Sequence, residues 1–148
     1  MLRIAKLTDY ATLLMVRLAR EPARQFSAAQ LADELGVPQP TVAKLLKRLL
    51  RAQLLSSVRG AAGGYSLAHA PRAISVADVV NAIEGPVALT ECARGKGNCS
   101  LEHDCATRAN WQFISRAVRV ALEAVSLADM AMPQMESVHL HTLRERRP

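Results

Sequence analysis

The three cysteines of the chain are the residues whose type and spacing most clearly suggest chemistry. Cys92, Cys99 and Cys105 are the only cysteines in the sequence, at the spacing C-x6-C-x5-C in a glycine-bearing stretch. Thiolates are soft ligands that select zinc or an iron–sulfur cluster over hard cations, and the nearby Arg94 and Lys96 favour the thiolate over the thiol. Zinc sites usually contain close cysteine pairs, which this spacing lacks. The stretch is therefore a candidate cluster site, with zinc binding and redox-active free thiols as the alternatives.

A basic helix supplies a second set of candidate functional residues. Apolar residues at positions 42, 45, 46 and 49 recur as on one face of a helix, whereas the opposite face is polar and basic. Two short helices joined by a tight turn, the second with a basic free face, form the helix-turn-helix that enters the major groove of DNA. An ordinary helical hairpin with a solvated basic face is the alternative. The candidate DNA contacts here are Gln39, Thr41, Lys44, Lys47, Arg48 and Arg51.

The helix before it is predicted from its two ends. Ser27 and Gln30 form a capping box, in which each side chain satisfies a backbone donor of the other residue. Gly36 can adopt the left-handed conformation that ends a helix, and Pro40 suits the first turn of the basic helix that follows. We include Ser27, at the start of the first of the two helices, among the candidate DNA contacts.

A glycine-rich hairpin follows the basic helix. Residues 54–58 and 65–67 are predicted strands, joined by a flexible tip at residues 59–64. A hairpin with a basic tip directly after a recognition helix is a wing, whose glycines let the backbone approach phosphates. Arg59 is long enough to reach a minor groove. Because helix-turn-helix and wing together are a specific combination, we predict that the chain binds double-stranded DNA, with Arg59 and Gly60 among its contacts.

The distribution of charge supports a polyanionic partner independently. The chain has 19 Lys and Arg against 13 Asp and Glu, a formal net charge of +6. No acidic residue lies between Leu35 and Ala77, so the Lys and Arg of that segment give it the net charge of the whole chain. A positive surplus confined to one motif is an electrostatic footprint for DNA rather than general solubilising charge.

The remaining sequence predicts further helices around this motif. Thr8 or Asp9 can cap a first helix that runs to about Arg20, and the capping-box pattern repeats at a later helix start. From about Ala106 a long helix carries more apolar face than a small winged domain can cover, which predicts a two-fold dimer interface. Folding back on its own domain is the alternative. The apolar stripe consists of Trp111, Ile114, Val118, Leu122 and Val125.

The expected fold class is mainly α with a small β-hairpin wing: a winged helix-turn-helix plus a long C-terminal dimerisation helix. We expect residues 1–86 to form the DNA-binding domain, 87–107 the cysteine loop, 108–132 the dimerisation helix and 133–148 a disordered tail. No apolar run could span a bilayer and the N-terminus lacks a signal-peptide pattern, so a cytoplasmic protein without a membrane partner is expected. No phosphate loop, dinucleotide fingerprint, paired carboxylates or Ser/Cys–His constellation suggests an enzyme.

These segments together resemble a known family. Ser57-Val58-Arg59-Gly60, Gly63-Gly64-Tyr65, the three cysteines and Trp111 are similar to the iron–sulfur-sensing winged-helix regulators that include IscR and NsrR, over roughly residues 1–130. Within that family the chain most resembles the regulators of the SUF iron–sulfur assembly operon. The resemblance implies a homodimer in which the three cysteines hold a [2Fe-2S] or [4Fe-4S] cluster, cluster state changes the DNA that is bound, and Arg59 contacts a groove.

The sequence departs from the family pattern in three ways. The first cysteine gap is one residue longer than usual, Arg108 stands where IscR has its ligand histidine, and Ala43 stands where IscR has an acidic residue in the recognition helix. The fourth ligand is therefore open. Asp9 resembles the arrangement of NsrR, in which an aspartate from the partner's first helix completes the site; its alternative role is a first-turn carboxylate. His103, an exogenous thiol and water are the other candidates.

We therefore predict a DNA-binding transcription regulator, acting as a repressor, whose operator affinity is controlled by an iron–sulfur cluster and which regulates SUF genes. Assembly of the cluster would order residues 92–105 and bias the separation of the two recognition helices. The alternative is a cluster-independent winged-helix regulator that senses thiol oxidation, zinc or a small ligand.

Overall fold

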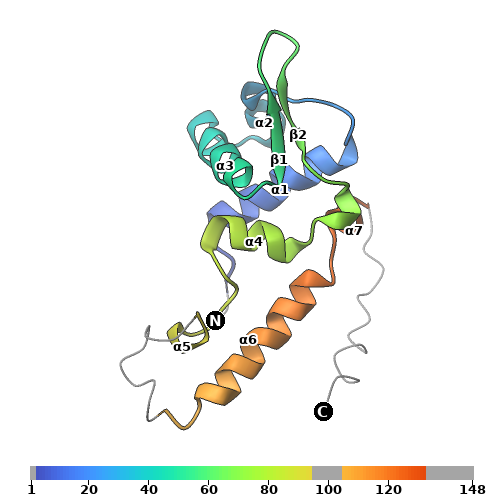
Figure 1. Ribbon diagram of the computed structural model, residues 1–148. Coiled ribbons are helices and arrows are strands. Elements are labelled where there is room, and N and C mark those ends of the chain that lie inside the picture. Colours follow the sequence, from blue (N-terminus) through green and yellow to red (C-terminus); the bar gives the residue numbers. More distant parts are fainter. Residues whose placement is uncertain (1–2, 95–104, 133–148) are drawn as a thin grey trace.

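The computed structural model describes residues 3–94 and 105–132. Figure 1 shows α1 to α4 and a two-stranded hairpin gathered in one body, with α6 extending away from it. This confirms the predicted mainly helical winged fold. Within the described ranges, no helix is long and apolar enough to cross a membrane. The elements are α1 (Lys6–Arg20), α2 (Ala28–Leu35), α3 (Gln39–Arg51), β1 (Leu55–Val58), β2 (Gly64–Leu67), the 3-10 turn η1 (Pro71–Ala73), α4 (Val76–Glu84), α5 (Glu91–Arg94), α6 (Arg108–Glu123) and α7 (Leu127–Ala131).

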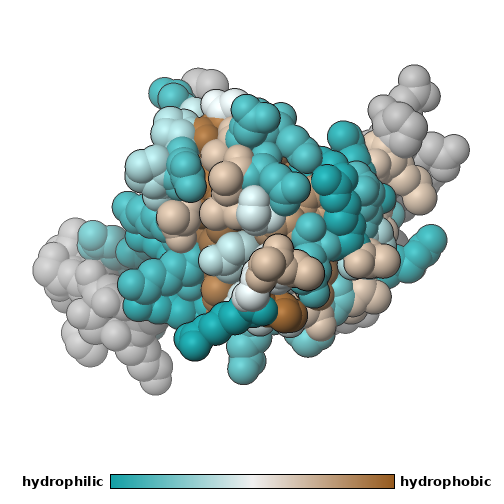
Figure 2. Space-filling view, turned by 90° about the horizontal axis from the view of Figure 1, so that it is seen from above, coloured by the Kyte–Doolittle hydropathy of each residue, from teal (hydrophilic) through white to brown (hydrophobic). Residues whose placement is uncertain are grey.

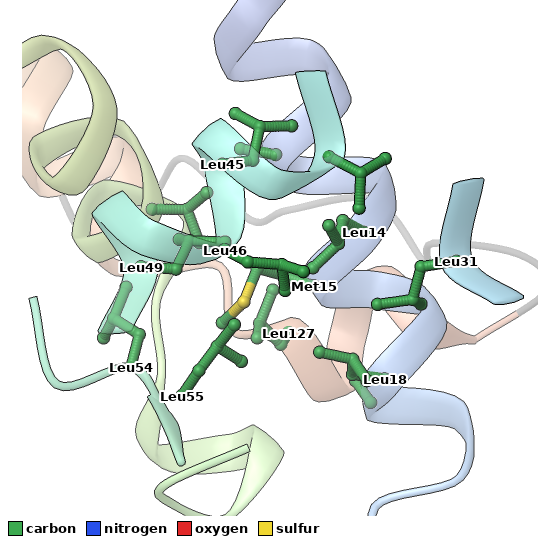
Figure 3. Packing of buried hydrophobic residues seen from close by; sticks show 14 of the residues in the cluster. Leu14, Met15, Leu18, Leu31, Leu45, Leu46, Leu49, Leu54, Leu55 and Leu127 are labelled. Carbon is green, nitrogen blue, oxygen red and sulfur yellow. The ribbon is translucent and has the colours of Figure 1, made fainter. Parts of the chain in front are cut away.

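The hydrophobic core lies between α1, α3 and the base of the hairpin (Figure 3). The apolar face predicted for α3 is buried, which confirms the 3.6-residue pattern. Burial of each such side chain stabilises the fold by about 1.5–3 kcal/mol, so the core fixes the rotation of α3 about its axis and turns its basic residues outward. The buried residues of α3 are Val42, Leu45, Leu46 and Leu49.

The ends of α2 are formed as predicted. The Oγ of Ser27 accepts a 3.1 Å hydrogen bond from the backbone N–H of Gln30, and the Gln30 Oε1 accepts one of 2.8 Å from the N–H of Ser27. Gly36 ends the helix at φ +62°, in the left-handed region. The turn between α2 and α3 is thus fixed at both sides.

The start of α1 differs from the prediction. The helix begins at Lys6 with Ala5 as its N-cap, and no side chain caps it. Thr8 is fully buried and its hydroxyl donates to the carboxylate of Glu84 at the end of α4. Thr8 is therefore used for a tertiary contact, whereas Asp9 is exposed in the first turn.

The hairpin is attached directly to the start of α2. The two strands pair antiparallel, from Leu55 opposite Leu67 to Val58 opposite Gly64. Phe26 and Tyr65 exchange two backbone hydrogen bonds, of 2.8 and 3.0 Å. Because these bonds tie β2 to the residue before the α2 cap, the wing and the helix-turn-helix hold a fixed relative position.

Two consecutive glycines make this close approach possible. A Cβ at Gly63 would lie 2.1 Å from the carbonyl oxygen of Val58, and one at Gly64 would lie 2.7 Å from that of Phe26. Both distances are far below van der Waals contact, and both neighbours are backbone atoms. The pair therefore allows the hairpin to fold and to dock on the α2 start.

The predicted continuous helix over 108–132 is interrupted. α6 ends at Glu123, and Ser126 and Asp129 form a new capping box that starts α7. The junction is bound to the winged domain by two backbone bonds of 2.9 Å, from Val76 N to Val125 O and from Leu127 N to Ile74 O, and the Leu127 side chain is fully buried. The last part of the predicted dimerisation helix thus belongs to the core of its own domain.

Candidate nucleic-acid interface and cysteine segment

The free face of α3 carries three exposed cations. Lys44, Lys47 and Arg51 are all exposed, with Gln39 exposed at the helix start and Thr41 half-buried in the first turn. Figure 2 looks onto the end of the molecule from which the hairpin projects, where hydrophilic side chains cover much of the surface. This is the arrangement predicted for a recognition helix.

These cations are not neutralised by neighbouring acids. Among residues 3–94 and 105–132, the ion pairs join Arg17 and Arg24 to Glu21 and Glu34, and Arg119 to Glu123. None includes a basic residue of α3 or of the hairpin. The positive field of α3 is therefore left for an external partner.

Arg48 differs from the other basic residues of α3. Its side chain is half-buried, and its Nη1 donates a 2.8 Å hydrogen bond to the backbone carbonyl oxygen of Ile83, in the last turn of α4. Position 48 is a helical neighbour of both Leu45 and Lys44, so it lies at the edge of the basic face, next to the buried one. The structure thus places Arg48 in an internal contact, contrary to the expectation that it points at DNA.

The wing presents its basic residue at an exposed tip. Arg59 is exposed, and Gly60 beside it has φ +114°, a conformation that favours glycine. Ser27 is half-buried because its side chain is used in the α2 capping box. Its backbone lies at the start of α2, next to the pairing of Phe26 with Tyr65 of β2.

The cysteine segment is described at its two ends only. Cys92 lies in the short helix α5, and Cys105 precedes α6, whereas Cys99 and His103 lie outside the described residues. In the part of the chain that is described, no three His, Cys, Asp or Glu residues gather as a metal site would require. The predicted ligand set therefore stays a prediction.

Cys105 has the chemistry of a soft ligand. Its Sγ lies 3.5 Å from the Oγ1 of Thr107. That hydroxyl, together with backbone N–H groups of Thr107 and Arg108 and the positive charge of Arg108, lowers the pKa of the Cys105 thiol below its ordinary value. A thiol that ionises readily fits a metal ligand, and it fits a redox-reactive cysteine equally well.

Replacing Thr107 with valine is expected to raise the pKa of Cys105. Valine cannot donate a hydrogen bond to the thiolate, so the charged form loses stabilisation and a larger share of the thiol stays protonated at a given pH. The measurement is the rate of alkylation by iodoacetamide across a range of pH, on cluster-free protein in which Cys92 and Cys99 are replaced by serine. In the Thr107→Val variant this rate should rise at a higher pH than in the same protein with Thr107. An unchanged midpoint would show that the hydroxyl has no part in the shift.

α6 has two apolar sides, and the stripe predicted to be free is exposed only in its N-terminal half, at Trp111 and Ile114. Val118 and Leu122 turn toward the winged domain, where they line a pocket with the end of α4. Buried Ser115 on the same side accepts a 3.1 Å hydrogen bond from the N–H of Leu89. The C-terminal half of the predicted stripe therefore covers its own domain, as in the alternative interpretation.

The free apolar face of α6 is centred on residues that the sequence pattern did not single out. Phe113 is 70% exposed and Val120 37% exposed, with Ala117 between them. Ile114, 41% exposed, borders this face, whereas Trp111, 40% exposed, lies two helical turns before Val118 on the side of the predicted stripe. The i, i+4, i+7 spacing of Phe113, Ala117 and Val120 was the signal, but alanine in the middle made it weaker than the Leu- and Val-containing stripe.

Comparisons with known proteins agree with this geometry. Residues 4–133 match the family model Rrf2, described as an iron-dependent transcriptional regulator. The HTH-type transcriptional regulator IscR of Escherichia coli O1:K1 is 30% identical over 134 residues, which cover 90% of this chain and 82% of that protein. The solved structure of CymR, the global cysteine regulator of B. subtilis, matches with a TM-score of 0.71 at 30% identity, covering 88% of this chain and 97% of CymR. T. potens IscR matches with a TM-score of 0.69 at 29% identity, covering 95% and 96%.

Proposed function

The chain belongs to the Rrf2 family of transcription regulators, and from that premise we propose that it is a homodimeric, DNA-binding repressor whose operator affinity is controlled by an iron–sulfur cluster. The matched proteins are transcription regulators, so this chain is a regulator and not an enzyme. We propose SUF iron–sulfur assembly genes as its targets, because the wing and cysteine segments resemble those of the regulators of that operon.

One observation carries the DNA-binding part of the proposal. Lys44, Lys47 and Arg51 are exposed on one side of α3 and have no acidic partner among the described residues, next to a wing that is hydrogen-bonded to the start of α2. A recognition helix contacts base edges and phosphates in the major groove while a basic tip can reach the neighbouring minor groove. We propose Gln39, Thr41, Lys44, Lys47 and Arg51 as groove and phosphate contacts, with Ser27, Arg59 and Gly60 at the flanking backbone.

Reversing one charge of α3 is expected to weaken DNA binding and to lower its salt dependence. Lys44→Glu leaves one phosphate without its cation, so the slope of log affinity against log salt should become shallower by about 1. The measurement is fluorescence anisotropy at several salt concentrations, with a duplex selected from a random-sequence pool by the wild-type protein. Arg20→Glu, an equal charge change at the exposed end of α1, is the control; equal losses of affinity in both variants would contradict a localised interface.

The free face of α6 supports the homodimer. Exposed Phe113 and Val120 project from a helix that already covers its own domain with its other side. In water such a face gains about 25 cal/mol for each Å² that it buries. A second copy offers the same face to it, which is the self-complementary geometry of a two-fold interface. We propose that two α6 helices pair through this face and set two copies of α3 on one side of the duplex.

The chemistry of the cysteine side chains supports the binding of an iron–sulfur cluster. Cys105, whose pKa is lowered by Thr107, is a soft ligand of the kind that iron–sulfur clusters select. We propose that Cys92, Cys99 and Cys105 hold the cluster, with Asp9 of the partner subunit as fourth ligand. When bound, the cluster would supply sensitivity to oxidants, nitric oxide or iron shortage. The role of this chain's own residues is to ionise the thiols and to connect their segment to α4 and α6.

Anaerobic purification tests cluster binding. A coloured protein that contains iron and acid-labile sulfide, with absorption and Mössbauer spectra of one cluster type, is expected. The Cys92→Ala, Cys99→Ala, Cys105→Ala variant should contain neither and should bind the selected duplex with the affinity of cluster-free wild type. A wild-type protein that stays colourless after reconstitution with iron and sulfide would contradict the proposal.

Regulation by thiol oxidation is the second candidate, and the lowered pKa of Cys105 favours it. CymR, which has a matching fold, is a global cysteine regulator. In this case the cysteines respond to oxidants without iron, since the thiolate is the form that oxidises. Peroxide-dependent loss of duplex binding by iron-free protein, reversed by dithiothreitol, would favour this function over cluster control.

A further inference from the structure

The last turn of α4 is held by residues from three other elements. The carbonyl oxygen of Ile83 accepts the hydrogen bond from Arg48 of α3, and that of Glu84 accepts one of 3.4 Å from Nη2 of Arg94 in α5. The Glu84 carboxylate accepts from the hydroxyl of Thr8 in α1. The last carbonyls of a helix lack intrahelical partners and carry partial negative charge, so two guanidinium groups suit this position.

The hydrogen bonds of Arg48 and Arg94 to this turn differ in length and in burial. Arg48 is half-buried, its bond is 2.8 Å long, and α3 packs on α4 through buried side chains. Arg94 is exposed, and its bond is 3.4 Å long. A pocket of about 300 Å³, lined by Glu84, Arg94, Val118 and Leu122 among others, lies beside it. The recognition helix is thus held firmly to the turn, whereas one long, exposed hydrogen bond joins α5 to it.

We propose that Arg48 is a positioning residue that transmits the state of the cysteine segment to the recognition helix through Ile83 and Glu84. The two accepting carbonyls belong to consecutive residues, Ile83 and Glu84. A displacement of Arg94 therefore acts on the same helical turn to which Arg48 is hydrogen-bonded. Arg94 is two residues from Cys92, and the proposal rests on the cysteine control put forward above. Arg48 acts here inside the protein, and Lys44, Lys47 and Arg51 remain the contacts to DNA.

Hydrogen exchange of the free protein tests this connection without DNA or a cluster. Four proteins are compared: wild type, Arg48→Met, Arg94→Met and the double variant. Arg94→Met is expected to change the exchange rates of α3 amides about twofold to thirtyfold in the presence of Arg48, and to leave them unchanged in the Arg48→Met background. The proposal is overturned if Arg94→Met changes the exchange rates of α3 by the same factor with and without Arg48. If Arg48 merely stabilises the fold, its loss raises the exchange rates without altering the effect of Arg94→Met.

Two further variants make the result specific. Arg48→Lys keeps a donor on a long side chain and should restore part of the Arg94 effect. Lys47→Met, an exposed neighbour on the same helix, should leave the Arg94 effect whole. A Lys47→Met protein in which the Arg94 effect also disappears would contradict a path through Arg48.

DNA affinity then separates this inference from the proposed function. The dissociation constant of the selected duplex is measured for cluster-loaded and cluster-free protein, and the ratio of the two is the coupling. Arg48→Met should bring this ratio toward one, whereas Lys47→Met should weaken both forms by the same factor. If the wild-type ratio is one, cluster control is contradicted, and the exchange experiment alone decides the role of Arg48. If the wild-type ratio differs from one and the Arg48→Met protein has the same ratio, the role of Arg48 is overturned.

Discussion

Phe113→Glu in α6 is expected to convert the protein to a monomer and to reduce its affinity for a two-half-site duplex by about 10²- to 10⁴-fold. The side chain is 70% exposed on the free apolar face, and a carboxylate there cannot be buried against a second copy without a large desolvation cost. A monomer loses the second recognition helix, whose binding would otherwise be intramolecular, and the avidity that this provides. Sedimentation equilibrium and duplex titration measure the two effects.

The matched control for this variant is Gln112→Glu. It introduces the same charge one residue away, on the polar side of the same exposed helix, so the dimer and its affinity for the duplex should be preserved. Val120 lies about two helical turns after Phe113 on the same free face. Val120→Glu should therefore have the same effect as Phe113→Glu. A dimer that survives both Phe113→Glu and Val120→Glu would show that subunits pair elsewhere.

Gly64→Ala is expected to lower the free energy of unfolding by about 2 kcal/mol or more. The added methyl group would lie 2.7 Å from the carbonyl oxygen of Phe26, and this neighbour is backbone that is hydrogen-bonded to Tyr65. The strand must therefore move away from the α2 start, which costs the two Phe26–Tyr65 bonds and changes the position of the wing. Urea unfolding followed by circular dichroism measures the stability.

Ala61→Ser serves as the control for the glycine variant. Ala61 is exposed at the hairpin tip, where a small polar substitution should change the free energy of unfolding by less than about 0.5 kcal/mol. Gly64→Ala should also weaken duplex binding at temperatures where it is folded, because Arg59 is displaced with the wing. Wild-type stability and affinity in Gly64→Ala would mean that the strand can move without cost.

Local signals in the sequence predicted the winged domain well. The capping box of Ser27, the left-handed Gly36 and the apolar face of α3 depend on residues within a few positions of one another, and each is present in the structure. The hairpin was predicted by its glycines, but the reason for Gly64 was not: that position meets Phe26, nearly forty residues earlier. Interactions between distant segments leave no period in the sequence.

The expectations that the structure contradicts share this origin. Thr8 has the side chain of a helix cap, yet it donates to Glu84 across the fold. Arg48 lies at the edge of the basic face, and only the position of α4 decides that its guanidinium turns inward to Ile83. In α6 both sides are apolar, and helical periodicity cannot tell which side the rest of the domain will cover.

The break in the helix at Ser126 affects the distance between the two winged domains in a pair of subunits. Residues 124–126 join α6 to a segment that is fixed in its own domain by Leu127 and by the bonds at Ile74 and Val76. In a pair formed through α6, the angle at this three-residue junction sets how far apart the two winged domains stand. In such a pair the spacing of the two half-sites in an operator would be set by this short junction beside η1, and a change of its length would select a different spacing.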